Sequence, residues 1–452
     1  MPRVLPSLRH WLRFAVIALL ALGCGDAPRP NVLLVTIDTL RADRLSGAGH
    51  SRQTTPYLDE LAASGVRFER AYASSSWTAP SVASLLTSLD PRRHGIEHGH
   101  LSEQVIVQQE VIPESLPLWP ELLRNAGYRT YGITANTHLY GHFGFDRGFD
   151  RYECIGFLTA DDVLETLERW QVEIAASEPW FVWIHLLDPH ARYTPRSPWI
   201  DQFFPRYQKL LRPLRDVLIP AQYAERGVTP GSRRFELVGA LYDSEIAYTD
   251  QAIRSISAAL RVDDHDLVIV TSDHGEEFLD HGGFGHGTTL YEEVLRVPLL
   301  LRLPGAAQAG RAVSSPVGGI DLLPTVLDLL GITAPDSLQG RSARPLIEGS
   351  ASEATPVSAS LDRFAPLAQD ALILGRWKYL EHRSSGERKL FDLEDDPAEQ
   401  RNRIELEPEK AEELAGMLAA RRADDRRRRV EPGSAELTEQ QLEQLKALGY
   451  AP

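Results

Sequence analysis

The sequence predicts an α/β fold with a mainly parallel sheet, and two observations carry this prediction. Largely apolar runs of strand length occur far apart in the chain, at residues 31–37, 180–184 and 265–270. Such runs are typical of central parallel strands that are buried on both faces. Acidic residues or histidines follow each run, and open α/β sheets bind ligands at the carboxyl ends of their strands. We therefore expect a functional site at that edge of the sheet.

The composition fits a globular protein with a substantial core. The chain has 452 residues, of which 43% are hydrophobic and 25% are charged, enough for one large domain or two smaller ones. Its formal net charge of −15 argues against general nucleic-acid binding, so we expect no nucleic-acid partner.

Residues 1–24 have the pattern of an export signal. A basic start is followed by an apolar run at 14–22, which is too short to span a membrane, and then by Gly23 and Cys24. The end of this segment resembles a bacterial lipobox, which implies cleavage before Cys24 and lipid attachment to its sulfur. We expect an exported lipoprotein of the cell envelope, tethered through residues 25–30. The alternative is a simple secretory signal, cleaved near Gly25.

Residues 74–88 read as a polar loop that runs into a helix. Pro80 suits the first helical turn, where its missing N–H costs nothing. Apolar residues then recur at helical spacing, at Val82, Leu85, Leu86 and Leu89. Thr78 is therefore expected at or just before a helix N-terminus, where the helix dipole favours an anion. Its hydroxyl is a candidate nucleophile, and the alternative is a plain threonine N-cap.

Candidate metal ligands follow the predicted strands. Asp38 comes directly after the first strand, and Asp273 and His274 come after the third. A neighbouring carboxylate and imidazole can bind one cation together. Alone, Asp38 could equally cap a turn. A second group of polar residues follows the strand at 180–184, and it comprises His185, Asp188 and His190.

These motifs together resemble the sulfatase family of the alkaline-phosphatase superfamily. The run from Thr78-Ala79-Pro80-Ser81 to Ser88 is similar to the sulfatase signature C/S-x-P-S-R-x-x-x-L-T-G. Thr78 stands where sulfatases have the Cys or Ser that matures to formylglycine, and Val82 replaces the accompanying Arg. The run is also similar to the T-x-P-N-x-x-S-x-x-T-G segment of nucleotide pyrophosphatase/phosphodiesterases, in which an unmodified Thr attacks phosphorus. The resemblance implies an alkaline-phosphatase-like α/β/α sandwich with a small C-terminal antiparallel sheet.

The resemblance also implies roles for the site residues. Four residues would bind a divalent cation (Ca, Mg, Mn or Zn) and activate the nucleophile: Asp38, Thr78, Asp273 and His274. His190 would protonate the leaving group or bind substrate, and His286 would bind an anionic oxygen of the substrate. His185 and Asp188 are further candidate substrate ligands. A second cation near Asp188 and His190 is an open alternative, and so is a substrate contact through Asn136 or His138.

The rest of the chain divides into three parts. We expect residues 31–354 to form the catalytic domain, 355–405 a C-terminal subdomain of short antiparallel strands, and 406–452 a charged helical tail. The tail arginines are expected to be solvated, namely Arg421, Arg422 and residues 426–429. Residues 196–236 read as an insertion that could be a lid over the site, a membrane-facing patch or a solvated helical excursion.

The sequence therefore predicts an exported, metal-dependent hydrolase of anionic esters. The reaction would be an in-line displacement at phosphorus or sulfur through a covalent Thr78 ester. Because the formylglycine precursor and its partner arginine are absent, we expect phosphate mono- or diesters to be cleaved faster than sulfate esters. The alternatives are a phosphoryl-group transferase acting on lipid or glycan and a non-catalytic binding protein on the same fold.

Overall fold

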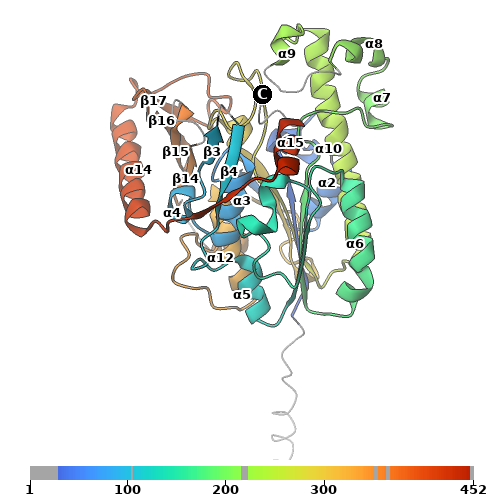
Figure 1. The fold of residues 1–452 in the computed structure, drawn as a ribbon. Helices are drawn as coiled ribbons and strands as arrows, with labels where there is room; N and C mark the ends of the chain where they lie inside the picture. Colours follow the sequence, from blue (N-terminus) through green and yellow to red (C-terminus); the bar gives the residue numbers. More distant parts are fainter. Residues whose placement is uncertain (1–28, 103–104, 215–221, 351–354, 363–366, 448–452) are drawn as a thin grey trace, which may run out of the picture.

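The structure is a computed structural model that describes residues 29–102, 105–214, 222–350, 355–362 and 367–447. The predicted export signal and most of the predicted tether lie outside the described residues, so that prediction is not tested. The chain is drawn in Figure 1, with the helices labelled around the large sheet.

A nine-stranded, mainly parallel sheet forms the centre of the molecule. Its central strand β1 (Val32–Ile37) pairs in parallel with β7 (Trp180–Leu186) and β8 (Leu267–Ser272), which confirms the three predicted strands. The order is β12-β2-β11-β8-β1-β7-β5-β6, with β13 also paired to β2. The outer strands are β2 (Val66–Tyr72), β5 (Arg129–Thr134), β6 (Arg151–Cys154), β11 (Arg296–Arg302), β12 (Arg311–Val313) and β13 (Val317–Gly318). Only the β11 pairings within this sheet are antiparallel.

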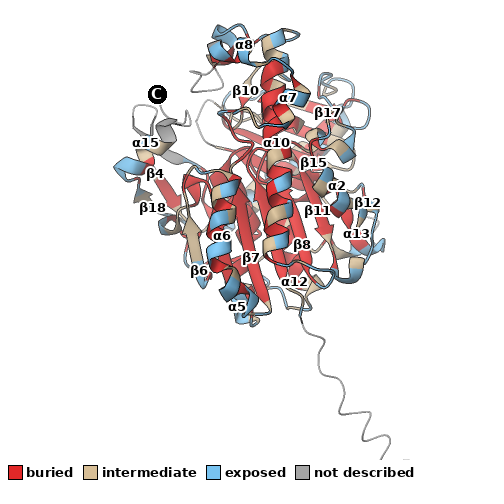
Figure 2. Cartoon of the chain, turned by 90° about the vertical axis from the view of Figure 1, so that its right-hand side faces the viewer, coloured by how far each residue is buried: buried red, intermediate tan, exposed pale blue. Residues whose placement is uncertain are grey.

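Helices cover both faces of this sheet, which confirms the α/β/α sandwich (Figure 1). One face carries α2 (Pro56–Ala63), α6 (Ala160–Ala175) and α10 (Arg233–Ala259). The other face carries α3 (Thr78–Thr87), α5 (Trp119–Asn125) and α12 (Leu322–Leu329). Figure 2 shows the central strands buried throughout, while the outer side of α6 is exposed. Burial on both faces explains why these strands read as continuous apolar runs.

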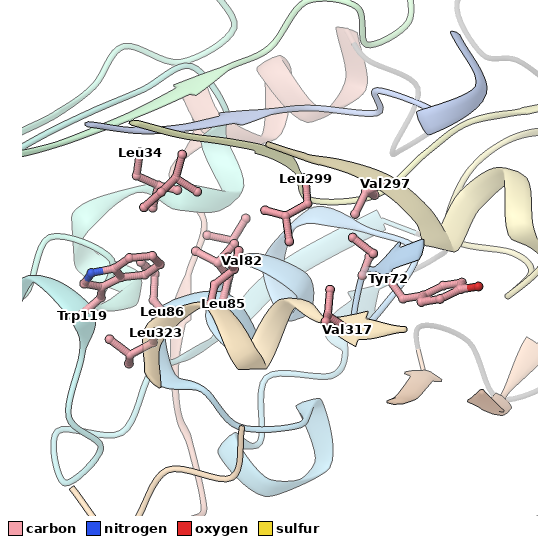
Figure 3. Packing of buried hydrophobic residues seen from close by; sticks show 14 of the residues in the cluster. Leu34, Tyr72, Val82, Leu85, Leu86, Trp119, Val297, Leu299, Val317 and Leu323 are labelled. Carbon is pink, nitrogen blue, oxygen red and sulfur yellow. The ribbon is translucent and has the colours of Figure 1, made fainter. Parts of the chain in front are cut away.

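Helix α3 is buried along its whole length and fixes the position of Thr78. Its apolar side packs in the larger hydrophobic cluster, where Val82 and Leu86 lie near Leu34 of β1 and Leu323 of α12 (Figure 3). The helix ends at Ser88, which adopts a left-handed conformation with φ of 57°. The Ser88 hydroxyl donates to the carbonyl of Ile320 at 2.6 Å, and this bond anchors the end of the helix.

The C-terminal subdomain contains the predicted antiparallel sheet. Its four strands are β14 (Val357–Leu361), β15 (Gln369–Leu374), β16 (Trp377–His382) and β17 (Arg388–Asp392). Helix α14 (Pro408–Arg428) packs on this sheet through a separate small apolar cluster that includes Leu390 and Leu414. The other face of this sheet packs in the larger hydrophobic cluster through residues such as Ala371 and Ile373, so this sheet is also buried on both faces.

The tail is not only helical, and this corrects the prediction. After α14 the chain returns to the catalytic domain, where β18 (Gly433–Glu436) pairs with β4 (Val105–Val111), which also pairs with β3 (Gly99–Ser102). The last described helix is α15 (Glu439–Ala447). The Thr438 amide donates to Gln441 Oε1 at 2.8 Å, and the Gln441 amide donates to Thr438 Oγ1 at 3.3 Å. These two bonds form a capping box at the start of α15.

The prediction that the tail arginines are solvated is wrong for three of them. Arg421 Nε lies 2.7 Å from Asp90, Arg422 pairs with Asp370 and Glu381, and Arg429 pairs with Glu97. Carboxylates from distant parts of the fold compensate these charges, and their positions cannot be read from the tail itself. The arginines at 426–428 are exposed, as predicted.

The described part of the insertion at 196–236 is helical, with apolar residues packed against the fold and many polar residues exposed. It contains α7 (Trp199–Phe203), α8 (Gln208–Leu211), a 3₁₀ turn at Arg212–Leu214 and α9 (Gln222–Glu225), and then enters α10. Phe204, Leu211 and Tyr223 are buried with residues of α10. The segment lies at the end of the molecule to which the carboxyl ends of the central strands point (Figure 1). Its predicted role as a lid stays a prediction.

Short elements complete the described chain. They are α4 (Pro91–His94), α11 (Glu292–Leu295), α13 (Arg344–Glu348), and the hairpin strands β9 (Glu277–Phe278) and β10 (Phe284–Gly285). No helix in the described part of the chain is both long enough and apolar enough to cross a membrane.

Candidate active site

Two carboxylates and an imidazole meet at the carboxyl edge of the sheet. Asp38 directly follows β1, and Asp273 and His274 directly follow β8. Because β1 and β8 are parallel neighbours, their ends bring these residues together. One ligand atom from each of the three lies within 4.8 Å of the others, and all three side chains are buried. This is the cluster that the sequence predicts.

The cluster has the donor atoms of a cation site. Asp38 Oδ1 and Asp273 Oδ2 are buried and accept no hydrogen bond from the described residues. His274 Nδ1 lies 3.0 Å from the Gly275 carbonyl, which can only accept, so Nδ1 carries the hydrogen and Nε2 has the lone pair. This Nε2 lies 3.6 Å from Asp38 Oδ1 and 3.4 Å from Asp273 Oδ2. Buried anionic oxygens without partners are costly, and a divalent cation would satisfy them.

The electrostatics of the two carboxyl groups point to the same conclusion. Burial alone would raise the pKa of Asp38, but His190, His185 and His274 outweigh it and hold this pKa below its ordinary value. Burial and the neighbouring Asp38 raise the pKa of Asp273 well above its ordinary value. Two carboxylates that share a buried site repel each other, and a positive ion between them relieves that repulsion.

Thr78 is the first residue of α3, as predicted, and its side chain belongs to the cluster. Thr78 Oγ1 lies 3.4 Å from His274 Nε2, and the Thr78 residue is fully buried. The N-cap position is Trp77, and no side chain caps this end of the helix. The alternative that Thr78 is a plain N-cap is therefore wrong. Ser81 Oγ donates to the Asp273 carbonyl at 2.5 Å and ties α3 to the loop after β8.

Asn136 connects Thr78 to the carboxylates. Its Nδ2 donates to Asp38 Oδ2 at 2.7 Å and lies 3.4 Å from Thr78 Oγ1, while its Oδ1 accepts the His138 amide at 2.9 Å. The His138 ring instead bonds to Gln109 at 2.8 Å. Of the two candidates that the sequence left open, the structure brings Asn136 into direct contact with the cluster.

His185 lies beside Asp38, within the sheet. It is fully buried in β7, its Nδ1 lies 2.8 Å from Thr36 Oγ1, and its Nε2 lies 3.6 Å from Asp38 Oδ2. These contacts give His185 a part in holding Asp38. Its role as a substrate ligand stays a prediction that none of these contacts supports.

Asp188 lies outside the cluster, and its role as a substrate ligand stays a prediction. Its Oδ2 accepts the Ala160 amide at 2.9 Å, and its Oδ1 pairs with Arg196. Both oxygens are therefore used within the fold. In the described chain, Asp38, Asp273 and His274 are the only His, Cys, Asp or Glu group with metal-ligand spacing. The alternative of a second cation bound by Asp188 and His190 has no support from this arrangement.

His190 and His286 border the cluster, as predicted. Their ring centroids lie 5.0 Å apart, and the His286 ring lies 4.4 Å from that of His274. His190 Nδ1 lies 2.5 Å from the Ala191 carbonyl, so its other nitrogen, Nε2, is the one that can exchange a proton in the site. Burial lowers the pKa of His190, although Asp38 opposes this effect.

Sequence reasoning missed Glu276, which lies next to this pair. Its side chain is fully buried, and its Oε1 lies 2.9 Å from His286 Nδ1. Glu276 closes the Ser-Asp-His-Gly-Glu run that contains Asp273 and His274. Its place in that run could have indicated that Glu276 lies near the site. The sequence does not show that its side chain points toward His286.

Comparison with known proteins agrees with this site and fold. Residues 30–332 match the family model described as Sulfatase, and residues 280–427 match the model of the C-terminal part of N-sulphoglucosamine sulphohydrolase. An arylsulfatase of Clostridium perfringens (strain 13 / Type A) is 24% identical over 449 residues, covering 84% of this chain and 91% of the relative.

Two solved structures have the same fold. The phosphonate monoester hydrolase of Agrobacterium radiobacter superposes with a TM-score of 0.71 at 22% identity, covering 88% of this chain and 96% of the other. A protein in complex with its substrate D-glucosamine-2-N,6-O-disulfate superposes with a TM-score of 0.71 at 18% identity, covering 88% and 98%. Since the Sulfatase model alone spans more than half of the residues, this chain belongs to the sulfatase family of ester hydrolases, within the alkaline-phosphatase superfamily.

Proposed function

We propose that the protein is a metal-dependent hydrolase of phosphate or sulfate esters, that unmodified Thr78 is its nucleophile, and that it acts faster at phosphorus. The observation that carries this proposal is the place of the Thr78 hydroxyl. It sits at the N-terminus of α3, 3.4 Å from both His274 Nε2 and Asn136 Nδ2. A helix N-terminus favours the negative charge that develops there.

The cation would be held by Asp38, Asp273 and His274, with Thr78 on the substrate side, and it would lower the pKa of the Thr78 hydroxyl. The candidates are Ca, Mg, Mn and Zn. Asn136 keeps the Asp38 carboxylate in place and donates toward the attacking oxygen. The residues of this chain thus supply the nucleophile, its orientation and the acceptors for one divalent ion.

The reaction has two in-line halves. Thr78 Oγ, after losing its proton to solvent, forms a bond to phosphorus while the bond to the leaving oxygen breaks. The leaving oxygen takes a proton from Nε2 of the doubly protonated His190 ring, whose positive charge Asp38 favours and whose Nδ1 donates to the Ala191 carbonyl. A water molecule then returns a proton to that nitrogen, and its oxygen attacks phosphorus as the bond to Thr78 breaks. The Thr78 oxygen regains a proton, so one ester and one water give one alcohol and one acid.

The preference for phosphorus rests on what surrounds Thr78. Formylglycine forms from Cys or Ser, and this chain has a threonine at that position. The residue in the place of the signature arginine is Val82, which is apolar and fully buried. The similarity to a phosphonate monoester hydrolase fold is in keeping with chemistry at phosphorus. Sulfate esters are the second candidate, because the fold is also similar to that of a protein solved in complex with a sulfated glucosamine substrate.

We also propose that the protein is exported and anchored by a lipid on Cys24. The support is the basic start, the short apolar run and the Gly23-Cys24 ending of the N-terminal segment. The enzyme would then act on anionic esters in the cell envelope, in the periplasm or at the outer surface.

One substrate panel tests the proposed chemistry. Purified protein is assayed with an aryl sulfate, an aryl phosphate and a bis-aryl phosphate, and its metal content is measured. We expect about one divalent ion per chain and a kcat/KM for at least one phosphorus ester that exceeds the sulfate value about tenfold or more. A preference for the sulfate would reverse the substrate assignment. Metal binding without turnover of any ester would favour a binding protein.

A further inference from the structure

The loop that carries His190 is bound to helix α10 at both of its ends. This loop, residues 188–196, follows β7 and is called the His190 loop below. At its start, Thr249 Oγ1 donates to the Asp188 carbonyl at 3.1 Å, and at its end the Arg196 amide donates to Ser244 Oγ at 3.3 Å. The position of the His190 ring therefore depends on how the loop sits on α10.

Glu245 of α10 binds the same loop between these two ends. Its Oε1 accepts both the amide and the hydroxyl of Thr194, at 2.9 and 2.6 Å. Its Oε2 is buried and accepts no hydrogen bond from the described residues, and the residue as a whole is 2% exposed. A buried anionic oxygen without a partner is costly, so a hydrogen on Oε2 fits these surroundings better than a negative charge does.

Two acids and one cation meet beneath the His190 loop. Arg196 pairs with Asp188, and its Nε lies 3.7 Å from Glu245 Oε1. Asp188 is buried as well, and its other oxygen accepts the Ala160 amide. One guanidinium matches one carboxylate, so the second acid has no counter-charge unless it keeps its proton. Burial and the neighbouring Asp188 raise the pKa of Glu245 to about 8.

Two phenols lie beside these groups and stay neutral where Glu245 titrates. Tyr223 of α9 is buried next to Glu245, and this burial raises the pKa of its phenol far above the neutral range. The guanidinium carbon of Arg196 lies 4.2 Å from the centre of the Tyr248 ring, and burial raises the pKa of Tyr248 to about 12. Asp161 of α6, whose amide donates to the Tyr248 hydroxyl, is exposed.

We propose that Glu245 is a positioning residue for His190: it holds the His190 loop against α10 while it carries its proton, and it holds the loop more weakly when charged. The bonds to Thr194 supply the hold. When Glu245 is charged, two buried carboxylates face one guanidinium, and a looser loop lets the excess charge reach water. The inference rests on the proposed function only for the part that His190 plays in the reaction.

The direction of the pH effect follows from the two states of the loop. In the held loop Glu245 keeps its proton up to about pH 8, whereas in a loosened and solvated loop it loses the proton near its ordinary pKa of 4.5. The held state is therefore favoured most below that ordinary value, and it loses this advantage as the pH rises to about 8. Above that pH both states are charged, and no further loss follows.

Hydrogen exchange of the loop tests the proposal without any turnover. Wild type and Glu245→Gln, as purified, are compared at about pH 5 and pH 8 through the exchange of peptide 187–198, with each rate divided by the intrinsic rate at that pH. The glutamine keeps the shape and the acceptor oxygen but cannot ionise. We expect the protection of the wild-type peptide to fall about tenfold or more between the two pH values, and that of the variant to change by less than about threefold. Equal falls in both proteins would overturn the proposal.

Asp243 gives a matched control on the same helix. It is a fully buried carboxylate of α10 that pairs with three cationic side chains of segment 44–52 instead of with the His190 loop. Asp243→Asn should leave the exchange of peptide 187–198 and its pH dependence as in the wild type. Loss of the pH dependence in this variant too would mean that the effect is not specific to Glu245, and would contradict the proposal.

The choice of leaving group tests whether the held loop positions His190. Glu245→Ala removes the acceptor of both Thr194 bonds, and Thr194→Val, a milder change, removes one of them. A 4-nitrophenolate leaves with little help from an acid, so a misplaced His190 should slow a phenyl ester more than the 4-nitrophenyl ester of the same acid. We expect Glu245→Ala to lower kcat on the phenyl ester about tenfold more than on the 4-nitrophenyl ester. Thr194→Val should show a smaller difference in the same direction.

The two readouts separate the possible failures. Faster exchange of peptide 187–198 in both variants, with equal losses of kcat on the two esters, would show that the loop does not position His190 and would contradict the positioning role. If the wild type hydrolyses no ester but shows the expected pH-dependent exchange, the proposed function fails while the hold of Glu245 on the loop stands.

Discussion

Thr78 Oγ1 lies 3.4 Å from His274 Nε2, although 196 residues separate the two in the sequence. The contact joins the N-terminus of a buried helix to the end of a central parallel strand. Helix α3 packs against the sheet along its whole length, so Thr78 has little freedom to move away from the cluster. A rigidly placed hydroxyl beside candidate cation ligands is what nucleophilic displacement needs.

Asp273→Asn should lower metal occupancy and reduce kcat/KM at least about 100-fold, because the amide keeps the shape but not the charge of the ligand. The fold should survive, since Oδ1 can still accept the amides of Thr39 and His274. Metal analysis, kinetics and a melting curve of the same preparation check the prediction. Wild-type metal content and turnover in this variant would contradict the site assignment.

Asn136→Ala should lower kcat by about 100-fold, the usual loss for one donor aimed at developing negative charge. The metal should stay bound, because Asp38 remains and Asn136 is not itself among the ligands. Gln109→Ala is the matched control, since Gln109 bonds to His138 and not to the cluster. A similar loss in both variants would mean that Asn136 acts only through the local packing.

The strands and the cluster could be predicted from sequence because both follow from local rules. A strand that is buried on both faces reads as an apolar run, and residues after parallel strands meet at one edge. Asp38 sits directly after one such run, and Asp273 and His274 follow another after two further residues. The helical spacing after Pro80 likewise placed Thr78 at the start of α3.

What could not be predicted depends on partners that are distant in sequence. Asp188 looks like a site residue next to His190, but Arg196 and the Ala160 amide occupy its oxygens. Strand β18 has no apolar alternation, and it forms because the edge of β4 is available to it. Similarly, the charged tail sequence predicts a solvated Arg421, but in the fold Arg421 pairs with Asp90. In each case the sequence around the residue does not indicate which distant residue it contacts.

Stability should fall as the pH rises through the range in which Asp250 loses its proton. Asp250 of α10 accepts the amides of Tyr57 and Leu58 at the start of α2, both at 2.9 Å, and burial raises its pKa to about 7. The folded chain therefore holds a proton that the unfolded chain releases between about pH 4 and pH 7. The free energy of unfolding should drop across this window by as much as about 4 kcal/mol.

Asp250→Asn should remove this contribution, because the amide does not titrate. The free energy of unfolding of wild type and variant is measured by chemical denaturation at about pH 5 and pH 8. The change between the two pH values is then compared between the two proteins, so that the contributions of all other titrating groups cancel. The wild type should lose more stability than the variant between the two pH values. Equal losses would show that Asp250 titrates normally in the folded protein.

Cys24→Ser should release the protein from membranes and leave its melting temperature unchanged, since the lipid would be attached to the Cys24 sulfur and the described fold begins after it. Fractionation of cells that express each form, with mass analysis of the mature N-terminus, checks this prediction. A wild-type protein that is soluble and has an unmodified N-terminus would show that the lipoprotein assignment is wrong.

The identity of the nucleophile is tested most directly by trapping the covalent ester. Wild-type protein and the variants Thr78→Ala and Thr78→Ser are mixed with a bis-aryl phosphate, quenched in acid and digested, and the peptide that contains Trp77 to Pro80 is examined by mass spectrometry. We expect a phosphate or phosphoester on that peptide in the wild type and in Thr78→Ser, with partial turnover in the serine variant because it keeps a hydroxyl at the helix N-terminus. Thr78→Ala should show neither the adduct nor turnover. Robust turnover by Thr78→Ala on any ester, or an adduct on a different residue, would show that Thr78 is not the nucleophile.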